Sequence, residues 1–395
     1  MPDEPRTEVT HAAPQPRDRR ATVLDDAPPP APADVDHRRL VENYTTIIRE
    51  RAIRYPVPYH FTRELGRGSQ GVVFLAMRQG SRGCLTRHAA KIFDPGIYSS
   101  SEKYWTDMGR IAGQVSRLQP LHVDHLVSGD IYNECNGVGY IEMAAIDGID
   151  LQYLLSGTHL AIARSQSTDE EWAHFTDVLF RIQEDTFRFQ PGIALYILRR
   201  ALLGLQVMHE AGFVHGDIKP SNIMIDRLGS VKLVDLGRAV IVGERISILL
   251  GSPFYMAPEV HRLEPAQIQS DIYSAGLVCL EMLCGQSLMH ALNPTEAELL
   301  EYKMSLLNQL EPTLPKYVRE NRLFVSILRR MLHPDPSRRY TSAENAEDSS
   351  QGIGGIHRQL SRLGLDAEYD RELAHYLEKL SDPTTGSLNP RLDWR

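Results

Sequence analysis

The run His-Gly-Asp-Ile-Lys-Pro-Ser-Asn at positions 215–222 constrains this chain more than any other stretch. It follows an apolar helical segment, and it precedes two short β-type runs, 223–225 and 231–234, which end at Asp235-Leu236-Gly237. Two such runs joined by a turn bring Asn222 close to Asp235. Carboxylate and amide oxygens are the ligands that Mg²⁺ prefers. The pattern therefore predicts a hairpin that presents a magnesium site.

The same run supplies two further groups with complementary chemistry. Asp217 is left free to orient a hydroxyl, and Lys219 is left free to neutralise a phosphate. Phosphoryl transfer needs mainly positioning and charge neutralisation. These residue types at this spacing therefore indicate a phosphoryl-transfer site.

A glycine cluster far upstream supports this interpretation. Leu-Gly-Arg-Gly-Ser-Gln-Gly-Val-Val at 65–73 predicts a strand, a glycine turn and a second strand. Glycines let backbone N–H groups approach phosphates closely. A dinucleotide-binding fold would need a helix directly after the glycines, whereas residues 72–75 continue as β. Taken alone, the glycines also fit an ordinary hairpin turn.

Lys91 lies inside the short apolar strand 89–93. Burying an ammonium without a partner is costly. An ATP phosphate is one plausible partner, and an exposed edge strand is the other explanation.

In this order the motifs resemble the signature set of the eukaryotic-type serine/threonine protein kinase family, in a bacterial-like form. The resemblance covers about residues 59–345 and includes the runs 251–259, 270–276 and 335–341. It implies an α+β, two-lobed protein-kinase-like fold with a small β-rich N-lobe and a larger, mainly helical C-lobe. It also implies that the chain uses ATP and Mg²⁺.

The resemblance assigns a role to each matching residue. Asp217 would orient the attacking hydroxyl, while Lys219 and Lys91 would neutralise phosphates. Asn222 and Asp235 would bind Mg²⁺. The expected ATP-binding residues, with Met143 at the gatekeeper position, are Gly66, Gly68, Ser69, Gly71, Val73, Ala89, Lys91, Met143 and Met224.

Structural roles follow from the same resemblance. Glu259 would form an ion pair with Arg339, and Asp271 would accept hydrogen bonds from the backbone near the catalytic loop. His215 and Leu236 would pack as apolar core positions.

The run 218–222 is similar to the serine/threonine type, because tyrosine-directed members usually carry Ala and Arg there. Ser252 matches a hydroxyl position of that type. The resemblance therefore implies protein substrates with serine or threonine acceptors, and the chain itself is one candidate substrate.

Three positions depart from the family pattern. Gly216 replaces an arginine that normally pairs with a phosphorylated residue, so activity should depend little on the hydroxyl of Ser247. Gln114 falls where the family has a glutamate that pairs with the strand lysine. Either Gln114 bonds Lys91 weakly or the helix is arranged differently. Leu236 replaces a phenylalanine, a change that an apolar site tolerates.

Composition shifts divide the chain. Residues 1–37 are Pro-rich and predict a disordered tail, and 38–58 predict an amphipathic helix that packs on the first lobe or forms a homodimer contact. The stretch of about 155–190 exceeds the family pattern. Because Trp172, Phe175, Val178, Leu179 and Ile182 recur there at helical spacing, it predicts either an extended helix on the second lobe or a regulatory insert. Residues 346–395 predict a C-terminal helical extension.

Charge and hydropathy limit the partners. A net charge of −8 gives no electrostatic case for nucleic acid. No apolar stretch approaches 18 residues, so no membrane span is expected. The 4 cysteines lack metal-site spacing and predict reduced thiols. Together these features favour a cytoplasmic protein.

Two other functions stay open from the residues. A pseudokinase would keep this fold as a binding or scaffold module, and Gln114 favours that interpretation. A small-molecule kinase is the second alternative, because His-Gly-Asp-x-x-x-x-Asn also resembles aminoglycoside and choline kinases. The glycine cluster and the Ala-Pro-Glu run at 257–259 favour protein kinases.

Overall fold

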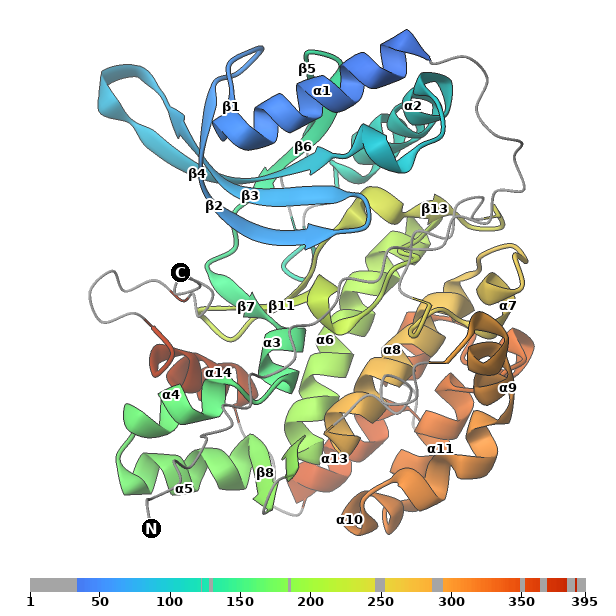
Figure 1. Cartoon of the computed structure of the whole chain (residues 1–395). Helices are drawn as coiled ribbons and strands as arrows, with labels where there is room; N and C mark the ends of the chain where they lie inside the picture. Colours follow the sequence, from blue (N-terminus) through green and yellow to red (C-terminus); the bar gives the residue numbers. More distant parts are fainter. Residues whose placement is uncertain are drawn as a thin grey trace, which may run out of the picture.

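The computed structural model describes residues 34–121, 123–127, 131–183, 186–245, 253–285, 294–348, 352–362, 368–381 and 388. They form a sheet-containing lobe and a mainly helical lobe, joined through the segment that follows strand β6 (Figure 1). The predicted α+β, two-lobed arrangement is therefore confirmed. Most of the predicted tail lies outside the described residues, as do Ser247 and Ser252.

The first lobe is built on one antiparallel sheet with the strand order β1-β2-β3-β4-β6-β5. Successive side chains of a strand point to opposite faces. In β4, Ala90 and Ile92 join the core on one face, while Ala89 and Phe93 join the other. Lys91 therefore shares the face of Ala89 and Phe93. The strands are β1 (Ala52–Ile53), β2 (Tyr59–Gly68), β3 (Gly71–Gln79), β4 (Leu85–Phe93), β5 (Ile131–Cys135) and β6 (Val138–Ala144).

Helix α1 (Val35–Glu50) crosses the first lobe, with its apolar stripe buried against that lobe (Figure 1). The predicted bounds 38–58 are corrected at both ends. The Asp34 side chain caps the helix by accepting a hydrogen bond from the backbone N–H of His37 at 3.0 Å. Arg51 adopts a left-handed conformation that ends it. A homodimer contact through this helix stays a prediction.

Helix α2 (Ser101–Leu118) packs beside α1, and Asp34 links their N-termini. Its second carboxylate oxygen accepts hydrogen bonds from the backbone N–H of Ser101 at 2.9 Å and from its hydroxyl at 2.7 Å. These hydrogen bonds lower the pKa of Asp34 to about 2, so the carboxylate stays charged at neutral pH.

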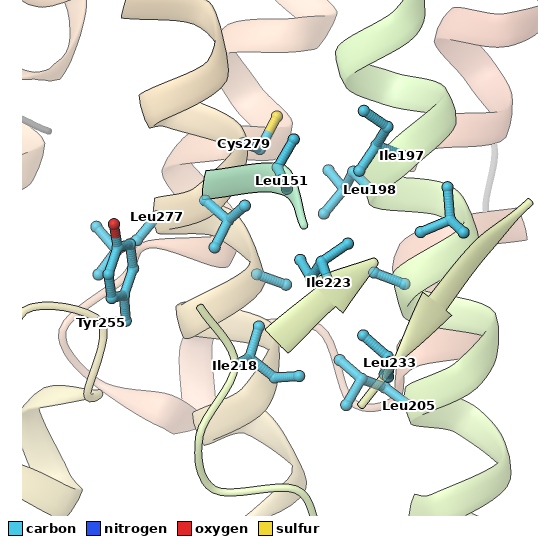
Figure 2. Packing of buried hydrophobic residues seen from close by; sticks show 14 of the residues in the cluster. Leu151, Ile197, Leu198, Leu205, Ile218, Ile223, Leu233, Tyr255, Leu277 and Cys279 are labelled. Carbon is cyan, nitrogen blue, oxygen red and sulfur yellow. The ribbon is translucent and has the colours of Figure 1, made fainter. Parts of the chain in front are cut away.

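The second lobe is organised around the buried helices α6 and α8. Figure 2 shows Leu151, Ile197, Leu198, Ile218, Ile223 and Leu233 meeting in one apolar cluster. Helix α8 begins at Ile268, and the Ser270 hydroxyl accepts from the backbone N–H of the cap residue Gln267 at 3.2 Å. The main elements are α3 (Leu151–Leu155), α6 (Pro191–Glu210), α7 (Pro258–His261), α8 (Ile268–Cys284), α9 (Glu296–Thr313), α10 (Lys316–Arg319), α11 (Arg322–Met331), α12 (Ala343–Asp348) and α13 (Ile353–Arg362).

Short strands accompany these helices. A three-stranded sheet has the order β12-β11-β7, and β10 pairs with β13. None of the described helices is long and apolar enough to cross a membrane. The strands are β7 (Gly148–Asp150), β10 (Phe213–Val214), β11 (Ile223–Asp226), β12 (Val231–Leu233) and β13 (Val240–Ile241).

The stretch predicted as an extended helix is instead two helices followed by a hairpin, which corrects that prediction. These elements are α4 (His159–Ser165), α5 (Asp169–Val178), β8 (Phe180–Gln183) and β9 (Thr186–Phe189). A new helix starts because Thr168 and Glu171 form a reciprocal capping box. Ile182, which the helical spacing included, lies in the hairpin.

Helix α14 (Tyr369–Glu378) packs on this insert through a cluster of aromatic rings. His159 is fully buried at its centre and contacts the rings of Phe180, Phe187 and Tyr376. Its Nε2 atom donates to the carbonyl of Leu154 at 2.7 Å, so a neutral ring accepts from the Tyr376 hydroxyl at Nδ1. Burial lowers the pKa of His159 to about 4.

This burial predicts a pH dependence of stability. Because the pKa of His159 is about 4 in the folded chain and 6.5 without burial, the unfolded chain binds more protons between these values. The free energy of unfolding should fall as the pH drops from 6.5 to 4, by up to about 1.4 kcal/mol per pH unit from this group. Urea unfolding of His159→Phe across this range should show the shallower slope. A matched exposed variant, His174→Gln, should keep the wild-type slope, and an unchanged slope in His159→Phe would contradict the assignment.

The predicted ion pair between Glu259 and Arg339 is confirmed and is fully buried. Arg339 donates to both carboxylate oxygens, from Nη1 at 2.7 Å and from Nη2 at 2.8 Å. Its other donors reach the backbone carbonyls of Gln269, His333 and Pro334. The pair therefore ties helix α7 to the segment after α11.

Removing the charge of Glu259 should be strongly destabilising, because it leaves a buried guanidinium without its counter-ion. Glu259→Gln should lower the free energy of unfolding by about 3–5 kcal/mol in urea titrations. The control Glu264→Gln alters a surface pair with Arg262 and should cost less than about 1 kcal/mol. Equal losses in the two variants would contradict this account.

Candidate active site

Asp217 is buried and held by hydrogen bonds in the loop between β10 and β11. Its Oδ2 atom accepts from Lys219 Nζ at 2.8 Å and from Asn222 Nδ2 at 3.0 Å. Burial opposes ionisation, but the charges of Arg238 and Lys219 outweigh it and hold the pKa of Asp217 below its ordinary value. The carboxylate is therefore ionised and fixed in place.

Apolar packing in the core of the second lobe holds this loop in place. Ile218 lies between Asp217 and Lys219 in the chain, and its side chain joins the cluster shown in Figure 2. Ile218 is only 1% exposed, so its burial holds the backbone of the loop against the core. The loop position therefore depends on the same packing that stabilises the lobe.

Asp271 fixes the start of the loop through the backbone, as predicted. Its two carboxylate oxygens accept from the N–H of His215 at 2.8 Å and of Gly216 at 3.0 Å. His215 is fully buried, as expected for a core histidine, and its Nδ1 accepts from the N–H of Asp217 at 3.3 Å. Leu236 is likewise buried in the core.

The hairpin of β11 and β12 places Asn222 next to Asp235. Ile223 pairs with Leu233, and the N–H of Val234 donates to the carbonyl of Asn222 at 3.0 Å. Because Asn222 Nδ2 donates to Asp217, its Oδ1 is the atom left to ligate a cation. Asp235 also has a carboxylate oxygen beyond the one bound by Lys91.

These donors fit Mg²⁺, which is usually held by one or two protein oxygens together with phosphates and water. No cluster of three His, Cys, Asp or Glu side chains that could hold a metal exists among the described residues. Asn222 and Asp235 would hold the cation together with phosphate oxygens and water.

Lys91 joins the two lobes through an ion pair with this hairpin. Its Nζ atom lies 2.5 Å from Asp235 Oδ1 and donates to Gln70 Oε1 at 2.8 Å. Burial works against the charge on Asp235, but the adjacent Lys91 more than offsets it and holds the pKa of Asp235 well below its ordinary value. The same burial lowers the pKa of Lys91, and the charge of Asp235 acts against that shift.

Gln114 does not contact Lys91, so the first of the two predicted arrangements is wrong. Its Oε1 atom accepts from Arg110 Nη1 at 2.7 Å, and Arg110 also donates to Asp107 Oδ1 at 2.8 Å. The helix thus supplies Lys91 with no carboxylate. Gln70, from the glycine turn, accepts the other hydrogen bond of the Lys91 ammonium.

The glycine turn is a tight hairpin in which Gly68 pairs with Gly71 and Ser69 and Gln70 form the tip. Gly71 has φ +145°, and a Cβ there would lie 1.9 Å from the carbonyl oxygen of Ile92. At Gly68, by contrast, a Cβ would meet no described atom within 4 Å. Packing explains Gly71, whereas the open side of Gly68 leaves room for a ligand beside the backbone.

The predicted adenine-binding residues come from both lobes. Val73, Ala89 and Met143 lie on the neighbouring strands β3, β4 and β6, and Ala89 is paired with Met143. Met224 lies on β11 and is half-buried. Gly66 sits at an irregularity of β2, opposite Val73.

Two residues at this site were missed from the sequence. Gln70 is buried against Lys91, and Arg238 lies between Ser69 and Asp217. The one feature of the sequence that could have identified Arg238 is its position directly after Asp235-Leu236-Gly237.

The segment before helix α7 is anchored by a buried lysine. Lys303 Nζ donates to the carbonyls of Pro253 and Met256. Burial lowers the pKa of Lys303 to about 7. This contact fixes the end of the segment that leads to Glu259.

Comparison with known proteins agrees with this geometry. The family model described as the protein kinase domain matches residues 59–349. Serine/threonine-protein kinase PknE of Mycobacterium bovis is 27% identical over 343 residues, which cover 85% of this chain and 52% of that protein. A probable serine/threonine-protein kinase, mkcD of Dictyostelium discoideum, is 31% identical over 189 residues, covering 46% of this chain and 28% of that protein.

A third relative is the cAMP-dependent protein kinase catalytic subunit of Schizosaccharomyces pombe. It is 30% identical over 178 residues, covering 44% of this chain and 32% of that protein. The chain thus spans about half or less of the length of these relatives.

The contacts of Lys91 predict the effect of changing Gln114. Gln114→Glu should place the new carboxylate beside Arg110 and leave the affinity for Mg·ATP within about twofold, because residue 114 does not contact Lys91. Lys91→Met, measured in parallel by titration calorimetry, should weaken Mg·ATP binding at least about tenfold through the lost charge-assisted contacts. A large change in Gln114→Glu would show that residue 114 contacts Lys91 after all.

Proposed function

The chain belongs to the protein kinase domain family, and on that premise we propose that it transfers the γ-phosphate of ATP to serine or threonine hydroxyls of proteins. One observation supports this most strongly. The ionised, buried carboxylate of Asp217 lies within hydrogen-bond distance of both Lys219 and Asn222. One loop therefore holds a carboxylate that can accept a proton, an ammonium that can neutralise a phosphate, and an amide oxygen that can ligate a metal ion.

Asp217 orients the acceptor hydroxyl and takes its proton as the oxygen attacks the γ-phosphorus. Lys219, bonded to the same carboxylate, neutralises charge on the transferring group. Holding both groups in one geometry before the substrate arrives lowers the entropic part of the barrier. The rigid support from Asp271 and Ile218 is therefore part of the proposed mechanism.

Lys91 binds phosphates from the first lobe, and Asn222 with Asp235 provides oxygens for Mg²⁺. When bound, the cation held by these residues would offset the negative charge of the phosphates. The glycine turn covers the triphosphate with its backbone. Val73, Ala89, Met143 and Met224 present apolar surface to the adenine ring.

The serine/threonine assignment rests on two supports. Lys219 stands two residues after Asp217, as in the serine/threonine type, and the matched relatives carry serine/threonine kinase names. The chain itself is one acceptor that can be tested at once.

A transfer assay tests the proposal directly. The purified chain should move labelled γ-phosphate from Mg·ATP to its own serine or threonine residues or to a generic basic protein. Asp217→Asn should reduce the rate by at least about a hundredfold, because general-base catalysis and positioning are lost. The same change at the exposed Asp177 should leave the rate within twofold.

The alternatives give different results in this assay. ATP binding without transfer to any protein would contradict the proposal and favour a pseudokinase. Label that appears only on an aminoglycoside or choline acceptor would favour a small-molecule kinase.

A further inference from the structure

Arg238 is the residue after Asp235-Leu236-Gly237, and its side chain lies between the two lobes. Its Nη2 atom donates to the Ser69 hydroxyl, at the tip of the glycine turn, at 2.8 Å. Its Nε atom lies 3.7 Å from Asp217 Oδ2. The guanidinium therefore spans the space between the glycine turn and the carboxylate of the catalytic loop.

Two donors of this guanidinium have no protein acceptor. Only 10% of the Arg238 side chain is exposed, and its Nε and Nη1 atoms are buried without a hydrogen-bond partner among the described residues. Buried charged donors are costly unless they are paired. Asp217 forms an ion pair with Arg238, but Nε lies 3.7 Å from Oδ2, too far for a hydrogen bond, and Oδ2 accepts from Lys219 and Asn222.

The surrounding charges favour an anion at these donors. Lys91, Lys219 and Arg238 face the two carboxylates Asp217 and Asp235, so the cations exceed the anions by one. A guanidinium also offers two parallel N–H groups that match phosphate oxygens, which an ammonium does not.

The position of Arg238 selects one phosphate of the nucleotide. Lys91 reaches Asp235 from the sheet of the first lobe. Arg238 instead approaches Asp217, the group that receives the proton of the attacking hydroxyl. The phosphate between the tip of the glycine turn and Asp217 is the one that is transferred.

We propose that Arg238 binds the terminal phosphate of the bound nucleoside triphosphate and neutralises it during transfer. This inference rests on the proposed function. In the reaction, the acceptor oxygen bonds to the γ-phosphorus while the bond to the β–γ bridging oxygen breaks. The electron pair of that bond stays with ADP, and the hydroxyl proton goes to Asp217. Arg238 stays beside the phosphoryl group throughout.

The test compares a triphosphate with a diphosphate. Titration calorimetry with the full chain and Mg²⁺ gives the affinities for a non-hydrolysable ATP analogue and for ADP. Arg238→Met should weaken analogue binding at least tenfold and ADP binding less than threefold, because ADP lacks the phosphate that the arginine contacts. Arg238→Lys, which keeps the charge but loses the second parallel donor, should fall between Arg238→Met and the wild type.

The matched control is Arg245→Met. Arg245 is exposed on the same segment, and its removal should change both affinities by less than twofold. Circular dichroism and thermal unfolding establish that each variant is folded. Arg238→Lys keeps the comparison valid if Arg238→Met fails to fold.

Equal losses for both nucleotides, or no loss for either, would overturn the proposal. Faster transfer by Arg238→Met with an unchanged analogue affinity would also overturn it and identify Arg238 as a brake on the glycine turn. The binding comparison needs no phosphoryl transfer. A wild-type chain that binds the analogue through Arg238 but labels no substrate would therefore contradict the proposed function and leave this inference standing.

Discussion

The ion pair between Lys91 and Asp235 is the contact on which the site depends, because it joins a strand of the first lobe to the hairpin of the second. The position of each partner is determined by the strands of its own lobe. The pleat of β4 directs Lys91 to the face it shares with Ala89 and Phe93. The pairing of β11 with β12 brings Asp235 beside Asn222. The attraction between the two charges, together with the hydrogen bond that Lys91 donates to Gln70, offsets the cost of burial.

Support for the catalytic loop comes from the core and not from the charged residues themselves. Asp271 holds the backbone of His215 and Gly216, and Ile218 is packed into the cluster of α6, α8 and β11 (Figure 2). Gly216 stands where the family has an arginine. The described contacts nevertheless fix Asp217 through Lys219, Asn222 and the nearby Arg238. This arrangement is consistent with a catalytic loop that is ordered without a phosphorylated residue as partner.

The sequence was most informative where the geometry is local. The hairpin that joins Asn222 to Asp235 spans few residues, so spacing alone predicted their proximity. The glycine turn is equally local, and the sequence predicted a strand on each side of it. Long-range pairs such as Glu259 with Arg339 became predictable only through the family resemblance.

The predictions were wrong where more than one neighbouring group could contact the same side chain, or where the chain turned unexpectedly. Gln114 lies on the buried side of α2, but its side-chain oxygen accepts a hydrogen bond from Arg110, one turn away on the same helix, and not from Lys91. The insert was misjudged because Trp172, Phe175 and Val178 continue in spacing to Ile182, although the chain turns into a hairpin after Leu179. Gln70 carries no local signal and Arg238 only its place after Asp235-Leu236-Gly237, because the importance of both comes from burial between segments that are far apart in sequence.

The central claim is that ATP and its cation bind between Lys91 and the hairpin of Asn222 and Asp235. The most direct measurement is a crystal structure of the chain with a non-hydrolysable ATP analogue and Mn²⁺, whose anomalous scattering locates the ion. The account predicts an anomalous peak about 2 Å from oxygens of Asn222 and Asp235 and from the phosphates. A nucleotide bound elsewhere, or a metal peak away from both residues, would contradict it.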